Sequence, residues 1–416
     1  MNPLLISGFG TSINVEKRKL IIQNKLKNEK LEFYPHQIDH DSIIVDGHSG
    51  SITFESMRWL LKHDINLTML NWNGNLLGVT LPQEPKIGKV RVKQYQKYLD
   101  DQFRFKIAFE IVNSKILSSL NLIKELSRFY NILNFNKFNK QFNDEFKNYN
   151  LNFKNKTGTI SDKLKKLMNF EGRIAQIYLE QFKKLVTELA PEFKFVGRMN
   201  KSSSWNANAS DEINALLNYG YAILESEVRK SLNSVGLDPT IGFLHELYYS
   251  KTPLVYDFQE LFRWIVDYSV IQLLDSRPKF KKSDFIVTEN YNIRLKESTA
   301  KALILKIKNN FNLKTPFKGK NYTYENVLFY KIQDFSNLIA DKNNKIDFKI
   351  PEFKIQNEDT LDFKGKILKM TPEERKRLGI NKSTLWYMKK NIQTGKRIKI
   401  YKKNILKDLK DFKLTS

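Results

Sequence analysis

The sequence predicts an α+β protein in three parts. Short apolar runs broken by glycines predict a small N-terminal β-rich domain over residues 1–88. Apolar residues at helical spacing then predict a large α-helical domain over 89–312. After a linker over 313–363, a capping-box sequence and two short helical segments predict a basic helix-turn-helix domain over 364–416.

The first part contains several runs of the length and composition of β-strands. Between them, the apolar spacing of Thr53–Lys62 predicts one short helix, with Thr53 or Ser51 as its N-cap. Residues 72–74, Trp-Asn-Gly, are typical of a hairpin turn. The predicted strands are Leu4–Ile6, Lys19–Ile22, Ser42–Val45 and Leu67–Leu70.

The second part turns helical at about Val90, after the prolines at 82 and 85. Long amphipathic patterns predict helices over 161–189, 211–231 and 255–274, followed by a short strand pair and a helix over 284–311. An Asn/Phe/Lys-rich stretch over 133–158 is predicted to be a loop. The polar, Lys- and Asn-rich residues 313–363 are predicted to be a semi-flexible linker.

The third part has the pattern of two short helices around a tight turn. Thr371–Glu374 is a capping box with a proline at the first helical position, and it predicts a helix ending at Leu378. A turn at Gly379–Asn381 leads to a second helix, Lys382–Lys390. This is the layout of a helix-turn-helix; the alternative is a basic helical hairpin that only packs against a neighbour.

Composition and charge narrow the class of function. With 416 residues, 41% hydrophobic, the chain can build real cores, and it has no apolar run long enough to span a membrane and no signal-peptide pattern. We therefore expect a soluble cytoplasmic protein without a membrane partner. The absence of cysteine leaves oxygen and imidazole ligands for any metal, which favours Mg²⁺ or Mn²⁺.

The net charge of +25 calls for a polyanionic partner, most commonly nucleic acid. A membrane surface, or a Lys-rich compositional bias without a binding role, is the alternative. Residues 364–410 contain sixteen Lys or Arg and three acidic residues, about half of the net excess. Charge concentrated in this way is typical of a DNA-binding surface.

Only one histidine, His245, follows position 63, and two carboxylates, Asp257 and Glu260, come shortly after it in the sequence. His245, Asp257 and Glu260 are the ligand types that suit a divalent metal with room left for substrate oxygens. The alternative for His245 is a hydrogen-bonded core residue. A further carboxylate, Glu171, stands beside Gly172, and a glycine inside a helix indicates close approach of another backbone or of a ligand. A solvated glutamate is the alternative there.

Four ordered runs resemble the signature segments of the CRISPR spacer-integrase family, and the resemblance extends from the first strand to about residue 310. These integrases insert short DNA into CRISPR arrays in a metal-dependent reaction. The runs are Glu171–Tyr178, Asn214–Tyr221, Gly242–His245 and Leu254–Arg263.

The resemblance implies a site and a reaction. Glu171, His245 and Glu260 would be the catalytic residues and the ligands of Mn²⁺ or Mg²⁺, with Asp257 as an acidic neighbour near the DNA backbone. A 3′-hydroxyl of donor DNA would attack a phosphodiester of target DNA, and the work on two strands implies a homodimer or a higher homo-oligomer. The candidate DNA-binding residues are Arg198, Lys382, Ser383, Thr384, Trp386, Tyr387, Lys389 and Lys390.

The C-terminal basic module distinguishes two branches of this family. Together with Trp59–His63 and Leu70–Gly74 it is similar to the casposases, the transposases of self-synthesising mobile elements. Two alternatives stay open. One is a CRISPR-system integrase that acts with a small partner protein, and the other is a non-enzymatic DNA-binding protein.

Overall fold

Two units make up the computed structural model, residues 1–353 and residues 354–416. Each has its own buried apolar side chains. The described residues are 1–7, 10–47, 49–71, 74–81, 88–153, 159–198, 209, 211–245, 252–276, 279–288, 293–345, 347–355, 370, 372–377 and 380–393.

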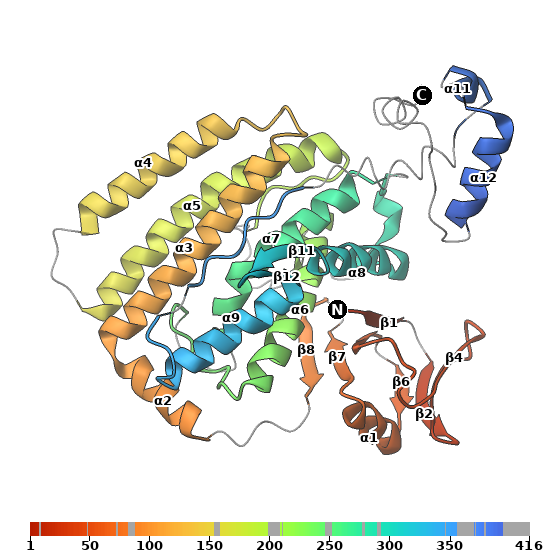
Figure 1. Cartoon of the computed structure of the whole chain (residues 1–416), viewed down its shortest axis with the longest axis horizontal. Helices are drawn as coiled ribbons and strands as arrows, with labels where there is room; N and C mark the ends of the chain where they lie inside the picture. Colours follow the sequence, from red (N-terminus) through yellow and green to blue (C-terminus); the bar gives the residue numbers. More distant parts are fainter. Residues whose placement is uncertain are drawn as a thin grey trace. The chain divides into compact units, whose positions relative to one another are not determined.

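The first unit begins with two four-stranded sheets and one helix (Figure 1). In one sheet, β1 and β5 are parallel, β5 and β7 are parallel, and β7 and β8 are antiparallel. The other has the order β4-β3-β2-β6. The strands are β1 (Pro3–Ser7), β2 (Thr11–Glu16), β3 (Lys19–Asn24), β4 (Glu29–Phe33), β5 (Ser42–Asp46), β6 (Gly50–Ile52), β7 (Asn66–Leu70) and β8 (Leu76–Thr80).

Local sequence explains the helix and the turn in this region. The hydroxyl of Thr53 accepts from the Ser56 backbone N–H at 3.2 Å, which caps helix α1 (Phe54–Lys62) as predicted. Trp59 and Leu60 of this helix join the apolar core between the sheets. Strands β7 and β8 pair antiparallel as a hairpin requires, and Gly74 has a φ of +79°, which favours glycine. Trp72 and Asn73 of the predicted turn lie outside the described residues.

Helices dominate the chain from residue 88 (Figure 1). Helix α7 is central: it packs against α3, α5, α6 and α8, and all its residues are buried except Tyr256, Arg263 and Gln272, which are half-buried. The long helices are α2 (Gly88–Leu99), α3 (Asp101–Leu126), α4 (Phe135–Phe153), α5 (Ile160–Leu189), α6 (Glu212–Ser234), α7 (Pro253–Leu274) and α8 (Glu297–Phe311). A 3-10 turn η1 (Lys282–Asp284) and the predicted strand pair, β9 (Phe285–Val287) with β10 (Ile293–Leu295), precede α8.

The loop predicted over 133–158 is wrong for residues 135–153, which form helix α4. Its aromatic residues recur every three or four positions, which is the spacing of one helical face. Phe138 and Phe142 are buried, and Tyr149 stacks on Phe170 of α5 with ring centroids 4.4 Å apart. The many Asn and Lys residues make the stretch polar in composition, but they leave this apolar stripe intact.

The linker predicted over 313–363 is wrong for residues 314–353. Strands β11 (Lys314–Phe317) and β12 (Lys320–Thr323) form a hairpin, helix α9 (Tyr324–Ile339) follows, and the chain then runs back over the bundle. Phe348, Ile350 and Phe353 are buried, and the Phe353 ring stacks on Trp264 of α7 at 3.9 Å. This segment completes the core of the first unit.

The second unit contains two short helices, α11 (Pro372–Arg377) and α12 (Lys382–Gln393). Their positions agree with the two helices predicted from the sequence. Met370, Ile380, Leu385 and Met388 are its buried apolar residues. Thr371 of the predicted capping box, the predicted helix end at Leu378, and Gly379 lie outside the described residues.

Candidate active site

The segment Gly242–His245 reaches the site because it lies against the first turn of α7. A Cβ on Gly242 would come within 2.5 Å of the Pro253 Cβ and 2.8 Å of its carbonyl carbon, so glycine is needed for this approach. The backbone N–H groups of Phe243 and Leu244 donate to Asp257 Oδ2 at 2.6 and 3.1 Å. The segment is therefore fixed to α7 by one carboxylate.

The same carboxylate orients the imidazole of His245. Asp257 Oδ1 lies 2.8 Å from His245 Nδ1 and accepts the His245 backbone N–H at 3.1 Å, and Asp257 is 0% exposed. Burial works against protonation, but the hydrogen bond and charge of Asp257 and the charge of Glu260 raise the pKa of His245. The expected place of Asp257 near the DNA backbone stays a prediction; in the structure its carboxylate is 0% exposed and contacts His245 and the backbone of residues 243–245.

The two glutamates meet across a lysine. Lys115 of α3 places its ammonium 2.5 Å from Glu171 Oε1 of α5 and 2.5 Å from Glu260 Oε2 of α7. Arg263, one turn along α7, lies 3.1 Å from Glu260 Oε1. Burial opposes ionisation of Glu260, but the charges of Arg263 and Lys115 lower its pKa to about 2. Glu260 is therefore held as a carboxylate.

The residues present fit a divalent cation. Within the described residues no three His, Asp or Glu side chains are already gathered closely enough to hold one. The donor set is nevertheless suitable: two carboxylates converge on one cationic group, and the Lys115 ammonium is the charged partner of the buried Glu260 Oε2. His245 contacts Asp257, which stands one helical turn before Glu260 on α7, so the imidazole and this glutamate belong to the same part of the helix.

A cavity of about 620 Å³ opens beside the glutamates. Arg198 and Arg263 line it, with their guanidinium carbons 5.1 and 4.2 Å from the Tyr221 ring centroid. Asp267 accepts from the hydroxyls of Tyr178 and Tyr221 at 2.7 and 2.5 Å. Lys115 is a third cationic side chain in this cavity, and the carboxylates of Glu171, Glu260 and Asp267 line it as well.

Gly172 also lines this cavity. The sequence predicted close approach of a backbone or a ligand there, and no described protein atom lies within 4 Å of a Cβ built on it. Close protein packing is therefore not the reason for this glycine, and the ligand alternative stays a prediction.

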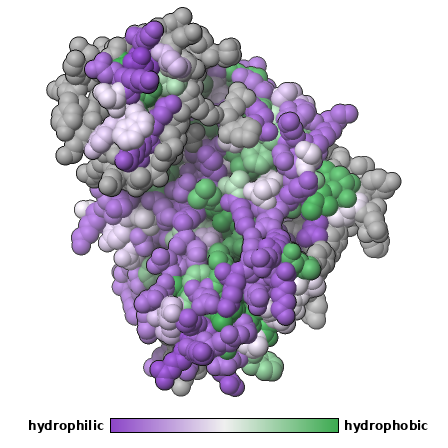
Figure 2. Space-filling view, turned by 90° about the vertical axis from the view of Figure 1, so that its right-hand side faces the viewer, coloured by the Kyte–Doolittle hydropathy of each residue, from purple (hydrophilic) through white to green (hydrophobic). Residues whose placement is uncertain are grey.

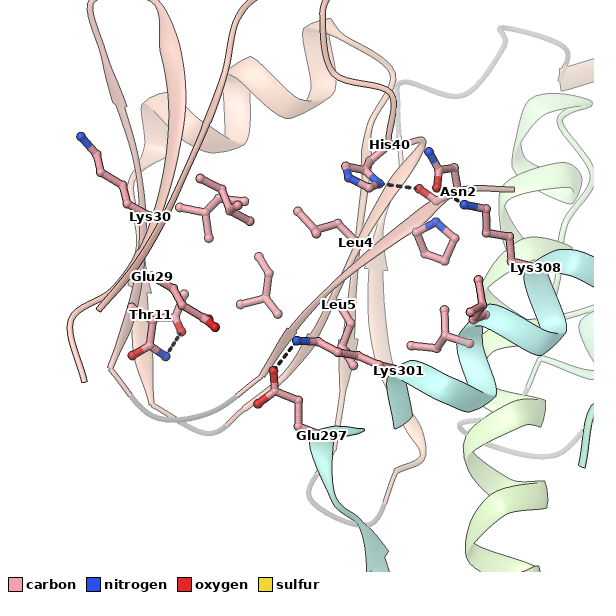
Figure 3. Close-up of a pocket in the computed structure, with 17 residues that line it drawn as sticks. Asn2, Leu4, Leu5, Thr11, Glu29, Lys30, His40, Glu297, Lys301 and Lys308 are labelled. Atoms are coloured by element: carbon pink, nitrogen blue, oxygen red, sulfur yellow. Dashed lines mark hydrogen bonds and ion pairs between the residues drawn. The ribbon is translucent and has the colours of Figure 1, made fainter. Parts of the chain in front are cut away.

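A second cavity of about 620 Å³ lies between strands β1, β3 and β4 and helix α8 (Figure 3). Its walls are largely apolar, and its polar groups are paired: Lys301 with Glu297 at 2.7 Å, and His40 Nδ1 with the Asn2 carbonyl oxygen at 3.0 Å. Lys308 of α8 donates to Asn2 Oδ1 at 2.5 Å, and this contact joins the N-terminal region to α8. The carboxylates of the first cavity do not reach it, so we place the candidate active site in the helical region.

Helix α12 presents most of the predicted DNA-binding side chains to solvent. Trp386 and Tyr387 are 61% and 62% exposed, and Lys390 lies 4.9 Å from the centroid of the Trp386 ring. Lys389 is half-buried and donates to the Met370 carbonyl. Lys382, Ser383 and Thr384 are exposed. Arg198, the remaining candidate, is half-buried and donates to Asn214 Oδ1 at 3.0 Å.

Sequence reasoning missed the cationic side chains of the site. Lys115 and Arg263 received no role, although Arg263 stands in one of the four motif runs. Helix α7 carried a usable signal: it is apolar on all sides except for charges at 257, 260, 263 and 267, and charges in a buried helix must be paired. The pairing of Lys115 is tertiary, and nothing near it in sequence indicates it.

The surface visible in Figure 2 is mostly hydrophilic, with apolar residues in small separate groups. Such a face suits a polar partner more than a broad apolar one. Among the described residues, no helix combines the length and the apolar character that crossing a membrane requires.

Comparison with known proteins places the chain in a family. A family model described as CRISPR associated protein Cas1 matches residues 4–309. A CRISPR-associated endonuclease Cas1 of Archaeoglobus fulgidus is 26% identical over 80% of this chain and 94% of that protein. A CRISPR-associated protein Cas1 of Methanobrevibacter ruminantium is 31% identical over 66% of this chain and 78% of that protein.

Among solved structures, a casposase bound to integration product is 34% identical, with a TM-score of 0.74, over 89% of this chain and 99% of that one. The family model covers both the β-rich region and the positions of Glu171, His245 and Glu260. The chain belongs to the CRISPR-associated Cas1 family.

Proposed function

We propose that the chain is a metal-dependent DNA integrase that joins the 3′-hydroxyl of donor DNA to a phosphodiester of target DNA. One observation carries the proposal: Glu171 and Glu260 converge on one cationic group within reach of His245, at the edge of a cavity lined by basic side chains. Such a reaction needs no covalent protein intermediate. The Cas1 endonucleases among its relatives support the same class of chemistry.

Each residue has a separate task in this proposal. A divalent metal, Mn²⁺ or Mg²⁺, held by Glu171, His245 and Glu260 would polarise the phosphoryl group and stabilise the attacking and leaving oxygens. Asp257 keeps the proton of His245 on Nδ1, which leaves Nε2 with the lone pair that a ligand needs. Arg263 holds Glu260 Oε1, and Arg198 and Arg263 offer charge to DNA phosphates in the cavity.

The casposase branch is the finer proposal, a transposase of a mobile element that generates target-site duplications. The 34% identity to a casposase over 89% of this chain supports it. Helix α12 supports it too, because its exposed aromatic and basic side chains suit a recognition helix in double-stranded DNA. We propose that the protein works as a homodimer or a higher homo-oligomer on donor ends and target.

A second candidate is a CRISPR spacer-acquisition integrase that acts with a small partner protein. The CRISPR-associated proteins among the relatives favour it. Two donors separate the candidates: DNA ending in the terminal repeats of a mobile element, and duplexes of protospacer length. Joining of the first without any added protein supports the casposase branch, and joining that requires the partner supports the other.

The catalytic assignment is tested by strand joining with fluorescent oligonucleotides in Mn²⁺. Glu171→Ala, His245→Ala and Glu260→Ala should each abolish joining while DNA binding persists. Glu180→Ala is the matched control, because Glu180 is an exposed glutamate on the same helix as Glu171. Joining retained by one of the three variants would remove that residue from the site, and joining in excess chelator would refute metal dependence.

A further inference from the structure

Lys115 occupies the carboxylates that the proposed function assigns to a metal. Its ammonium lies 2.5 Å from an oxygen of Glu171 and 2.5 Å from an oxygen of Glu260, and so bridges the two carboxylates. We propose that Lys115 is a built-in competitor of the metal: its ammonium holds the position between Glu171 and Glu260, and a divalent cation binds only when it leaves. This inference rests on the proposed function, since it takes those carboxylates as metal ligands.

Geometry makes the two cations mutually exclusive. The ammonium lies 2.5 Å from an oxygen of each glutamate, so a divalent cation held by the same two carboxylates would need the space that the ammonium fills. Two positive charges in contact repel strongly inside a protein, and the lysine side chain is 21% exposed, so bulk water screens the pair only weakly. Lys115 must therefore move before the metal is held by both glutamates.

The structure provides the means for this movement. The ammonium is carried on a flexible four-carbon stem, and Lys115 lines the same cavity of about 620 Å³ as both glutamates. Glu260 does not need to follow it, because Arg263 holds the other oxygen of that carboxylate at 3.1 Å. The lysine can swing into the cavity while Arg263 keeps Glu260 in place.

The competition has a measurable consequence for metal affinity. A protein whose binding-competent state is only partly populated binds its ligand more weakly by that fraction. Removing the ammonium should populate the competent state fully. The lysine also neutralises two close carboxylates, so the same substitution should destabilise the protein when no metal is present and make added metal more stabilising.

The test is calorimetric titration of the full chain, freed of metal by chelation, with Mn²⁺ alone. Lys115→Met keeps the length of the side chain and should bind Mn²⁺ about tenfold or more tightly than the unaltered chain. Lys106→Met is the matched control, an exposed lysine on the same helix, and should stay within about twofold. If Lys115→Met does not fold, Lys115→Gln replaces it with the same expectation.

Thermal unfolding gives a second readout. Lys115→Met should melt below the unaltered chain without metal, and saturating Mn²⁺ should raise its melting temperature by more than that of the unaltered chain. Equal or weaker Mn²⁺ binding by the folded variant overturns the inference. If the unaltered chain still binds Mn²⁺ and joins DNA when this happens, the proposed function is kept and only the competition by Lys115 is refuted. If neither the unaltered chain nor the variants bind Mn²⁺ at millimolar concentration, both fall.

Discussion

Replacing Asp257 with asparagine tests how the site is built. Asp257 accepts three backbone N–H groups and faces His245 Nδ1 while fully buried. An amide has one accepting oxygen. If that oxygen keeps the N–H groups of Phe243 and Leu244, the new NH₂ group faces the N–H of His245 and its imidazole.

The expected loss can be worked out from these contacts. Hydrogen bonds to a charged group contribute about 1.5–3 kcal/mol each, and two of the four contacts lose their carboxylate acceptor. Asp257→Asn should therefore lower the free energy of unfolding by about 3–6 kcal/mol. The NH₂ group can still donate to Nδ1, but only in the tautomer that carries its proton on Nε2, and a protonated Nε2 cannot bind a metal. Metal affinity and strand joining should fall together.

Urea unfolding and Mn²⁺ titration measure the two effects. Asp275→Asn is the control, because this exposed residue at the other end of α7 accepts from the Tyr130 hydroxyl, and an amide oxygen can still do so. Its unfolding free energy should change by less than about 1 kcal/mol. If Asp257→Asn unfolds at the same urea concentration as the unaltered chain and binds Mn²⁺ equally well, then Asp257 does not organise this site.

Three further outcomes are expected. Folding lowers the pKa of Glu260 from 4.5 to about 2, so its ionised form contributes about 3 kcal/mol to the free energy of unfolding above pH 4.5, and this contribution is lost as the pH falls towards 2. In urea unfolding between these pH values, Glu260→Gln should lose less stability than the unaltered chain. If both lose stability equally, the ion pairs of Glu260 do not stabilise the fold. Gly242→Ala should lose about 1–3 kcal/mol through its clash with Pro253, whereas Gly172→Ala, which meets open space, should gain up to about 1 kcal/mol in the same unfolding assay. A chain ending at 355 should fold and lose DNA affinity in gel-shift assays, whereas one ending at 312 should expose apolar surface and aggregate; equal solubility would refute the role of residues 314–353.

The sequence predicted best where local pattern decides structure. The cap at Thr53, the turn at Gly74 and the long helices carry their own signals of hydroxyl, glycine and apolar spacing, and the structure confirms them. Residues 135–153 and 314–353 form ordered structure although their polar composition predicts a loop and a linker, because a few aromatic residues at regular spacing pack into the core. Their order comes from tertiary packing, such as Tyr149 on Phe170 and Phe353 on Trp264.

The site divides in the same way. Residue types indicated His245, Asp257 and Glu260, and Gly172 indicated Glu171. Resemblance chose Glu171, His245 and Glu260 from these as metal ligands, and that assignment stays a prediction. The burial of Asp257 and the bridge made by Lys115 depend on which helices meet, which spacing along one chain does not contain. Resemblance to a family identifies the proposed metal ligands, whereas the cations that pair with the glutamates, Lys115 and Arg263, are identified only by the structure.

The stacking of Phe353 on Trp264 sets where the chain can be cut or extended. The first unit ends at this residue, whose ring lies on the helix that carries Glu260 and Arg263. The second unit begins after Phe353, the last residue of the first unit. A C-terminal module can therefore be added to or removed from the first unit without breaking the packing of its core.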